Sequence, residues 1–156
     1  MTQRPSAVSC RRAITLQTGN LRRCIRILES AYDGLQKHDA DDILYDIYRA
    51  ACVKEFELVL EQSGKLLRKK LRPWFASNRQ VDRLVFKDVV RHAARRGLVS
   101  ADAGERWLEY RDNRNDTAHD YGAGFADATL KLLPQFIIDA NALADAIEEP
   151  EPGDDV

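Results

Sequence analysis

Apolar residues recur at helical spacing along the first half of the chain, and strand signals are nearly absent throughout. From about Ile14 to Gln36, leucines and isoleucines fall near one stripe, which predicts a first helix. A second, longer helix is predicted from about Asp42 to Arg72, with one apolar face: Leu44, Tyr48, Cys52, Phe56, Val59, Leu67 and Leu71. Pro73 is expected to end it, because proline lacks the N–H that the helix needs.

A third helix is predicted after the tetrapeptide at residues 77–80, which has the S-x-x-Q form of a capping box. Gly97 stands where a C-terminal glycine cap belongs. Between these two signals lie apolar residues that we expect to face the core: Val81, Leu84, Val85, Val89 and Ala93.

Two more helices are predicted in the last third of the chain. Ser100 or Asp102 opens a fourth helix, which we expect Gly122 and Gly124 to break. A fifth runs from about Phe125 to Ile147 and contains Pro134, which should kink it or split it in two. The pattern therefore predicts an all-α protein, an up-down helical bundle of about five helices.

Length and composition favour one soluble domain, because 156 residues suffice for a single core. Residues 1–147 are expected to form this domain, and residues 148–156 an acidic, disordered tail. No apolar run approaches the ~20 residues of a membrane span, and no signal peptide is recognisable. The three cysteines have no C-x-x-C spacing, so we expect reduced cysteines in a cytoplasmic protein.

The net charge of −1 conceals an uneven distribution. Removing the tail's five carboxylates leaves the rest of the chain at +4. Basic residues concentrate in three clusters: Arg11, Arg12, Arg22, Arg23 and Arg26; Lys65, Arg68, Lys69, Lys70 and Arg72; and Arg91, Arg95 and Arg96. Such clusters attract nucleic acid, but for any one cluster a solvated helix face is the favoured interpretation.

The densest group of chemically versatile side chains is the run from Arg114 to Tyr121, which has the form R-N-x-x-x-H-x-Y. On a helix, Asn115 and His119 lie one turn apart and share a face. Arg114 and His119 are five residues apart and diverge by about 140° in a regular helix. They converge only if the helix loosens near Gly122 or if a second subunit supplies its own copy.

An arginine and a histidine at this spacing often occur together by chance, but two such runs that share one cleft would suit RNA cleavage without a metal ion. A base must remove the proton of the 2′-hydroxyl, and an acid must protonate the leaving 5′-oxygen. The ordinary pKa of histidine is about 6.5, so His119 can serve in either role. Arg114 offers a planar fork of donors to the phosphate, and Asn115 can hold a phosphate oxygen or fix the histidine tautomer. No metal-ligand group is recognisable, and no cofactor is expected.

The run resembles the signature of the HEPN superfamily, and in particular its nucleotidyltransferase-substrate-binding branch. Residues 48–57 resemble the branch's second-helix pattern, in which an arginine precedes an F-E pair, and residues 97–99 and 107–109 resemble its G-L-I turn and W-L segment. The similarity extends from about Leu16 to Ile147. Two departures are Asn113, where the family often has an acidic residue, and residues 62–65, which lack the usual aromatic–lysine pair.

The resemblance implies a homodimer whose single cleft is built from two motifs. It implies an RNase toxin with Arg114, Asn115 and His119 as catalytic residues, and a cognate minimal nucleotidyltransferase as antitoxin. It also implies that transfer of AMP to Tyr121 silences the site. The alternative is a non-catalytic subunit that binds nucleotide or presents a substrate to that nucleotidyltransferase.

Overall fold

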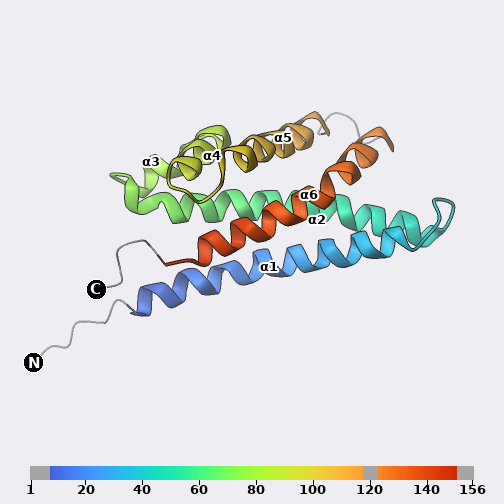
Figure 1. The fold of residues 1–156 in the computed structure, drawn as a ribbon, viewed down its shortest axis with the longest axis horizontal. Helices are drawn as coiled ribbons and strands as arrows, with labels where there is room; N and C mark the ends of the chain where they lie inside the picture. The colour runs from blue at the N-terminus through green and yellow to red at the C-terminus, as the bar shows by residue number, and fades with distance from the viewer. Residues whose placement is uncertain (1–7, 118–122, 151–156) are drawn as a thin grey trace, which may run out of the picture.

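The computed structural model describes residues 8–117 and 123–150, and in these ranges it is all-helical, as predicted. One short 3-10 helix (η1) and six α-helices follow one another along the chain (Figure 1): α1 Val8–Gln36, α2 Ile43–Leu71, η1 Arg72–Trp74, α3 Asn78–Asp82, α4 Phe86–Arg95, α5 Ala101–Thr117 and α6 Ala123–Glu148.

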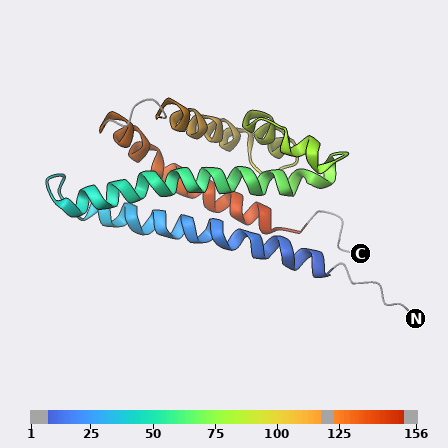
Figure 2. The ribbon, with the colours of Figure 1, turned by 180° about the vertical axis from the view of Figure 1, so that it is seen from behind.

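The long helices α1 and α2 form an antiparallel hairpin, and α6 packs against both of them. Helices α3, α4 and α5 lie along the side of α2 that faces away from α1, as both views show (Figures 1 and 2). The end of α5 and the start of α6 therefore lie toward the α1–α2 turn. The end of α5, where the candidate motif begins, lies beside α2.

Local signals in the sequence determine several helix ends. Asp42 caps α2 by accepting a hydrogen bond from the Leu44 N–H at 2.9 Å. Ser77 caps α3, with its Oγ accepting from the Gln80 N–H at 3.2 Å. Gly97 follows α4 with φ of +75°, a conformation that a side chain rarely adopts.

The core centres on four aromatic rings contributed by α2, α5 and α6. Phe136 lies 4.5 Å from Phe56 and 4.9 Å from Tyr110, measured between ring centroids. Trp107 lies 5.6 Å from Tyr110 with its ring nearly perpendicular. All four side chains are almost fully buried, so this contact joins the motif helix α5 to the rest of the bundle.

The predicted third helix is wrong in one respect, because the chain forms two helices there. Val85 is extended (φ −70°, ψ 154°) and precedes α4, so its side chain leaves the apolar stripe and is 63% exposed. Leu44, also predicted to face the core, is 41% exposed near the start of α2. A short turn and a helix end redirect these side chains, which spacing alone does not reveal.

The last helix also differs from the prediction at both ends. Gly124 does not break the chain, since α6 already begins at Ala123. Pro134 lies inside α6 and does not split it; the helix changes direction between its orange and red parts in both views (Figures 1 and 2). Helix α6 continues to Glu148, the first residue of the expected tail.

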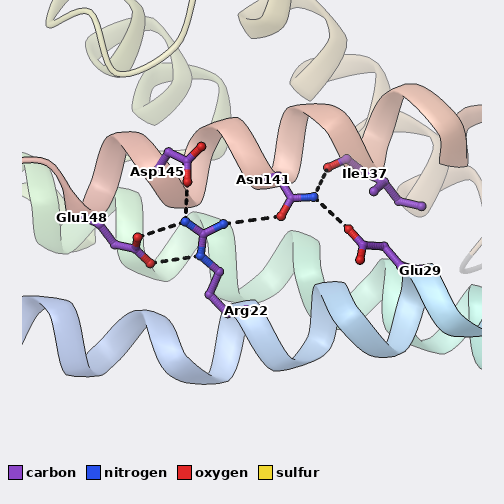
Figure 3. A network of polar contacts seen from close by, with 6 residues as sticks. All are labelled: Arg22, Glu29, Ile137, Asn141, Asp145 and Glu148. Atoms are coloured by element: carbon purple, nitrogen blue, oxygen red, sulfur yellow. Dashed lines mark hydrogen bonds and ion pairs between the residues drawn. The ribbon is translucent and has the colours of Figure 1, made fainter.

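Glu148 is held on the bundle by a polar network that connects α1 with α6 (Figure 3). Arg22 donates to both carboxylate oxygens of Glu148, at 3.0 and 2.9 Å, and to Asp145. Asn141 accepts from Arg22 and donates to Glu29 at 3.0 Å. The hydrogen bonds from Arg22 lower the pKa of Glu148 below its usual value.

Candidate functional site

The candidate motif begins on the last turn of α5 and continues beyond the described residues. Arg114 is half-buried near the end of α5, and the backbone of Asn115 is still helical. His119 and Tyr121, with Gly122, lie outside the described residues. The helix thus reaches Thr117 without loosening, and of the predicted site residues only the Arg114 side chain is described.

A buried ionic lock fixes α5 to α6. Asp139 accepts two hydrogen bonds of 2.8 Å from Arg106, one of 2.6 Å from the Tyr110 hydroxyl and one of 3.2 Å from Gln135. Burial raises the pKa of Tyr110, and its hydrogen bond to Asp139 raises it further, so the phenol stays protonated as the donor. One turn before Arg114, the motif helix is therefore held rigidly.

A second contact holds the end of α5 beside the start of α6. The Asn113 amide donates to the hydroxyl of the buried Thr129 at 3.1 Å. Asn113 stands where the family often has an acidic residue. A hydroxyl can accept from an amide or donate to a carboxylate, so an acidic residue could make the same contact. The departure therefore leaves this contact between α5 and α6 in place.

Arg114 belongs to a row of three arginines from two helices, with Arg111 in the middle. Arg111 lies three residues before it on α5, with its Cζ 5.4 Å from the centre of the Phe86 ring. Arg68 of α2 donates to the Leu84 carbonyl at 3.1 Å. Burial lowers the pKa of Arg111, and the charges of Arg114 and Arg68 lower it further. The like charges are therefore close enough to repel one another.

Gly64 of α2 lies beneath this arrangement. A methyl group at Gly64 would lie 3.4 Å from Arg68 Nη1 and 3.5 Å from the Phe86 ring. The Arg68 guanidinium and the Phe86 ring thus cover the glycine from one side. Both distances are ordinary van der Waals contacts, so alanine would also fit at this position.

The carboxylate that Arg114 influences is Glu61, on the exposed face of α2. A hydrogen bond of 2.9 Å from Lys65 lowers the pKa of Glu61, and the charge of Arg114 adds a smaller effect. The acid is therefore shared between Lys65 and Arg114.

Most residues of the three basic clusters that the structure describes serve the fold. Arg22 joins α1 to α6, and the buried Lys70 donates to the Glu149 carbonyl at 2.7 Å beyond the end of α6. Arg91 pairs with Asp88, and Arg96 lies 5.0 Å from the Trp74 ring.

The second cluster differs, because it supplies Arg68 to the group around Arg114. Sequence reasoning missed Arg111 and the convergence of these arginines, since Arg68 and Arg111 are far apart in sequence.

Other chemistry is sparse in the described part of the chain. No group of three histidine, cysteine or acidic residues there could hold a metal ion. None of the described helices combines the length and apolar character needed to cross a membrane. Cys24 and Cys52 are free thiols, and burial raises the pKa of Cys52 to about 11, which makes it unreactive.

Comparison with known proteins places this geometry in a family. The family model described as "Nucleotidyltransferase substrate binding protein like" matches residues 16–149, nearly the whole bundle. The chain belongs to this family. Its resemblance to the HEPN nucleotidyltransferase-substrate-binding branch is thereby confirmed.

Two relatives from Haemophilus influenzae support the assignment. One is named probable ribonuclease HepT, and it is 30% identical over 107 residues, covering 69% of this chain and 72% of its own. The other is the solved structure of HI0074, described as the fold of a substrate binding domain of a nucleotidyltransferase. It has 25% identity and a TM-score of 0.62, covering 80% of this chain and 99% of its own. The first is named as a nuclease and the second as a binding domain.

Proposed function

We propose that this protein is a metal-independent endoribonuclease, the toxin of a cytoplasmic toxin–antitoxin pair with a minimal nucleotidyltransferase. The observation that carries the proposal is the placement of Arg114, at the end of a rigidly held helix and among other arginines. The segment with His119 follows within five residues. The similarity to a protein named probable ribonuclease HepT supports the same reading.

In this proposal each motif residue has a separate role. His119 transfers protons, as the base for the 2′-hydroxyl or the acid for the leaving oxygen. Arg114 stabilises the charge that develops on the phosphate. Asn115 orients either the phosphate or the imidazole. None of these steps requires a metal ion.

The proposed active form is a homodimer, because Arg114 and His119 would diverge within one regular helix. The described surface offers an apolar face for a second copy on the outward sides of α1 and α2: Ile27, Ile43, Leu44 and Ile47. Ile43 and Glu61 are 18 residues apart, or five turns, so they share one stripe of α2. Because Arg114 acts on Glu61, this stripe leads from the apolar residues at the start of α2 to the neighbourhood of Arg114, about 27 Å along the helix.

The first test is cleavage of RNA by the purified protein with and without EDTA. We expect cleavage that EDTA leaves unchanged and that Arg114→Ala and His119→Ala abolish. Asn115→Ala should be slower than wild type but active, because an amide orients groups and transfers no proton. The products should end in a 2′,3′-cyclic phosphate or a 3′-phosphate. Cleavage that persists in His119→Ala would contradict the mechanism.

The proposed regulation is transfer of AMP to Tyr121, which would place a negatively charged group beside Arg114 and repel RNA. Intact-mass spectrometry after co-expression with the partner nucleotidyltransferase tests this step. We expect a gain of one or more AMP units in wild type and none in Tyr121→Phe. If the unmodified protein is fully neutralised by its partner, then neutralisation works through binding alone.

The second candidate function is a non-catalytic subunit that binds nucleotide or presents a substrate to the nucleotidyltransferase. The description of HI0074 as a substrate binding domain favours it. Expression in a bacterial host separates the two candidates. A nuclease toxin should arrest growth when expressed alone, and its His119→Ala variant should not, whereas a binding subunit should leave growth unchanged in both forms.

A further inference from the structure

Arg68 and Arg111, the two arginines that accompany Arg114, keep unused hydrogen-bond donors among the described residues. Among the described residues, Arg111 makes no hydrogen bond and no ion pair, and its guanidinium is held by the Phe86 ring alone. Arg68 uses Nη2 to hold the Leu84 carbonyl, while its buried Nε has no hydrogen-bond partner in the described structure. Buried N–H groups of charged residues are costly to leave unsatisfied.

Packing explains the position of these side chains but not their charge. Phe86 lies against both Gly64 and the Arg111 guanidinium, so a neutral side chain of similar length could cover the same ring. Instead, a second guanidinium, that of Arg68, lies near Arg111, and no described carboxylate pairs with Arg111. Such an accumulation of positive charge is stabilised when an anion binds.

We propose that Arg68 and Arg111 form a second phosphate site, which binds the phosphodiester next to the one held by Arg114 on the same RNA strand. Arg111 and Arg114 lie three residues apart on one face of α5, so their guanidinium groups can contact neighbouring points of an extended backbone. Arginine suits this task, because its planar fork binds phosphate oxygens in pairs. Arg68 and Arg111 therefore position RNA and take no part in proton transfer.

This inference rests on the proposed nuclease function but makes a separate prediction about binding. The probe is a short 2′-O-methyl RNA with a fluorescent label, which lacks the free 2′-hydroxyl and cannot be cleaved by the proposed route. Fluorescence anisotropy measures its Kd at salt concentrations from about 50 to 200 mM. We expect Arg68→Gln and Arg111→Gln each to raise the Kd about tenfold, the usual effect of one charge-assisted hydrogen bond. Each should also reduce the slope of log Kd against log salt by roughly 0.7.

Two further variants make the experiment specific. Arg95→Gln removes the same charge from an exposed position on α4 and should leave the Kd within twofold of wild type. Arg111→Lys keeps the charge but loses the planar fork, so its Kd should lie between those of wild type and Arg111→Gln. Far-UV circular dichroism of each variant checks that the bundle is intact, since Arg68 also holds the Leu84 carbonyl.

Cleavage kinetics distinguish this inference from the proposed function. If the site positions RNA, Arg111→Gln should raise KM about tenfold with kcat within a few-fold of wild type. Should wild type cleave RNA while Arg68→Gln and Arg111→Gln bind the probe as Arg95→Gln does, the phosphate site is refuted and the nuclease proposal stands. Should the variants lose probe binding while wild type cleaves nothing, the site stands and the nuclease proposal fails. A wild type that binds no RNA refutes both.

A free nucleotide offers the same phosphate chemistry and is tested as a second probe. ATP is titrated against the labelled RNA on wild type and on Arg111→Gln. If the site belongs to an RNA strand, ATP should compete only weakly, because it cannot span Arg114 and Arg111 as successive phosphodiesters of one strand do. Displacement of the RNA by ATP at a lower concentration than unlabelled RNA would overturn the assignment to RNA.

Discussion

Replacing Asp139 by asparagine tests whether the α5–α6 lock holds the motif helix. The Asp139 side chain is only 4% exposed and accepts hydrogen bonds from Arg106, Tyr110 and Gln135. Asparagine has nearly the same shape but no charge and only one acceptor oxygen. The change therefore removes the ion pair and places an NH2 group against the donors that now converge on the carboxylate.

The structure gives the size of the expected effect. Removing one partner of a buried ion pair costs about 3–5 kcal/mol. The loss here should be smaller, because the Arg106 side chain is 35% exposed and water can solvate it in the variant. We therefore expect Asp139→Asn to reduce the free energy of unfolding by about 2–3 kcal/mol. For a chain of this size the melting temperature should fall by roughly 5–10 °C.

The matched control is Asp145→Asn, the same chemical change two turns later on α6. Asp145 also pairs with an arginine, but its side chain is 67% exposed. Exposed ion pairs contribute about 0–1 kcal/mol, so this variant should melt within about 3 °C of wild type. Urea denaturation at pH 7, followed by far-UV circular dichroism, gives the free energy of unfolding for all three proteins.

The pH dependence provides a second check. Burial acts to raise the pKa of Asp139, but the hydrogen bonds from Arg106, Tyr110 and Gln135 outweigh it and hold the pKa below its usual value. Stability from a lowered carboxyl pKa is present above the unfolded value of about 3.9 and is lost as the pH falls through the folded value. The difference between wild type and Asp139→Asn should thus be full at pH 7 and shrink below about pH 4. Equal losses for the two variants, or a difference independent of pH, would refute the lock.

Two further predictions concern the surface and the thiols. Ile47→Glu places a charge on the apolar face of α1 and α2 and should convert a dimer to a monomer in light scattering. The control Ile138→Glu, on α6, should leave the dimer intact. A wild type that is monomeric at micromolar concentration would rule out the homodimer. Because burial raises the pKa of Cys52 to about 11, iodoacetamide at pH 8 should leave Cys52 unmodified in the folded protein and label it in urea, as peptide mass spectrometry can show.

The sequence by itself determined the helical class and most helix ends, because these depend on residues close together along the chain. Asp42 and Ser77 cap helices through bonds to N–H groups two or three residues away, and Gly97 supplies the positive φ that ends α4. Periodicity of apolar residues likewise reports one face of one helix. The motif from Arg114 to Tyr121 was recognisable for the same reason, as a short run of fixed spacing.

Only the tertiary structure decided which charged residues act together. Ion pairs join residues that are far apart in sequence: 126 residues separate Arg22 from Glu148, and 33 separate Arg106 from Asp139. No local pattern pairs them. The turn at Val85 exposes a side chain that periodicity assigned to the core. The proximity of Arg68 to Arg111 likewise depends on how α2 packs beside α4 and α5. Packing brings distant residues together because burial and charge act through space, whereas a sequence pattern registers only separation along the chain.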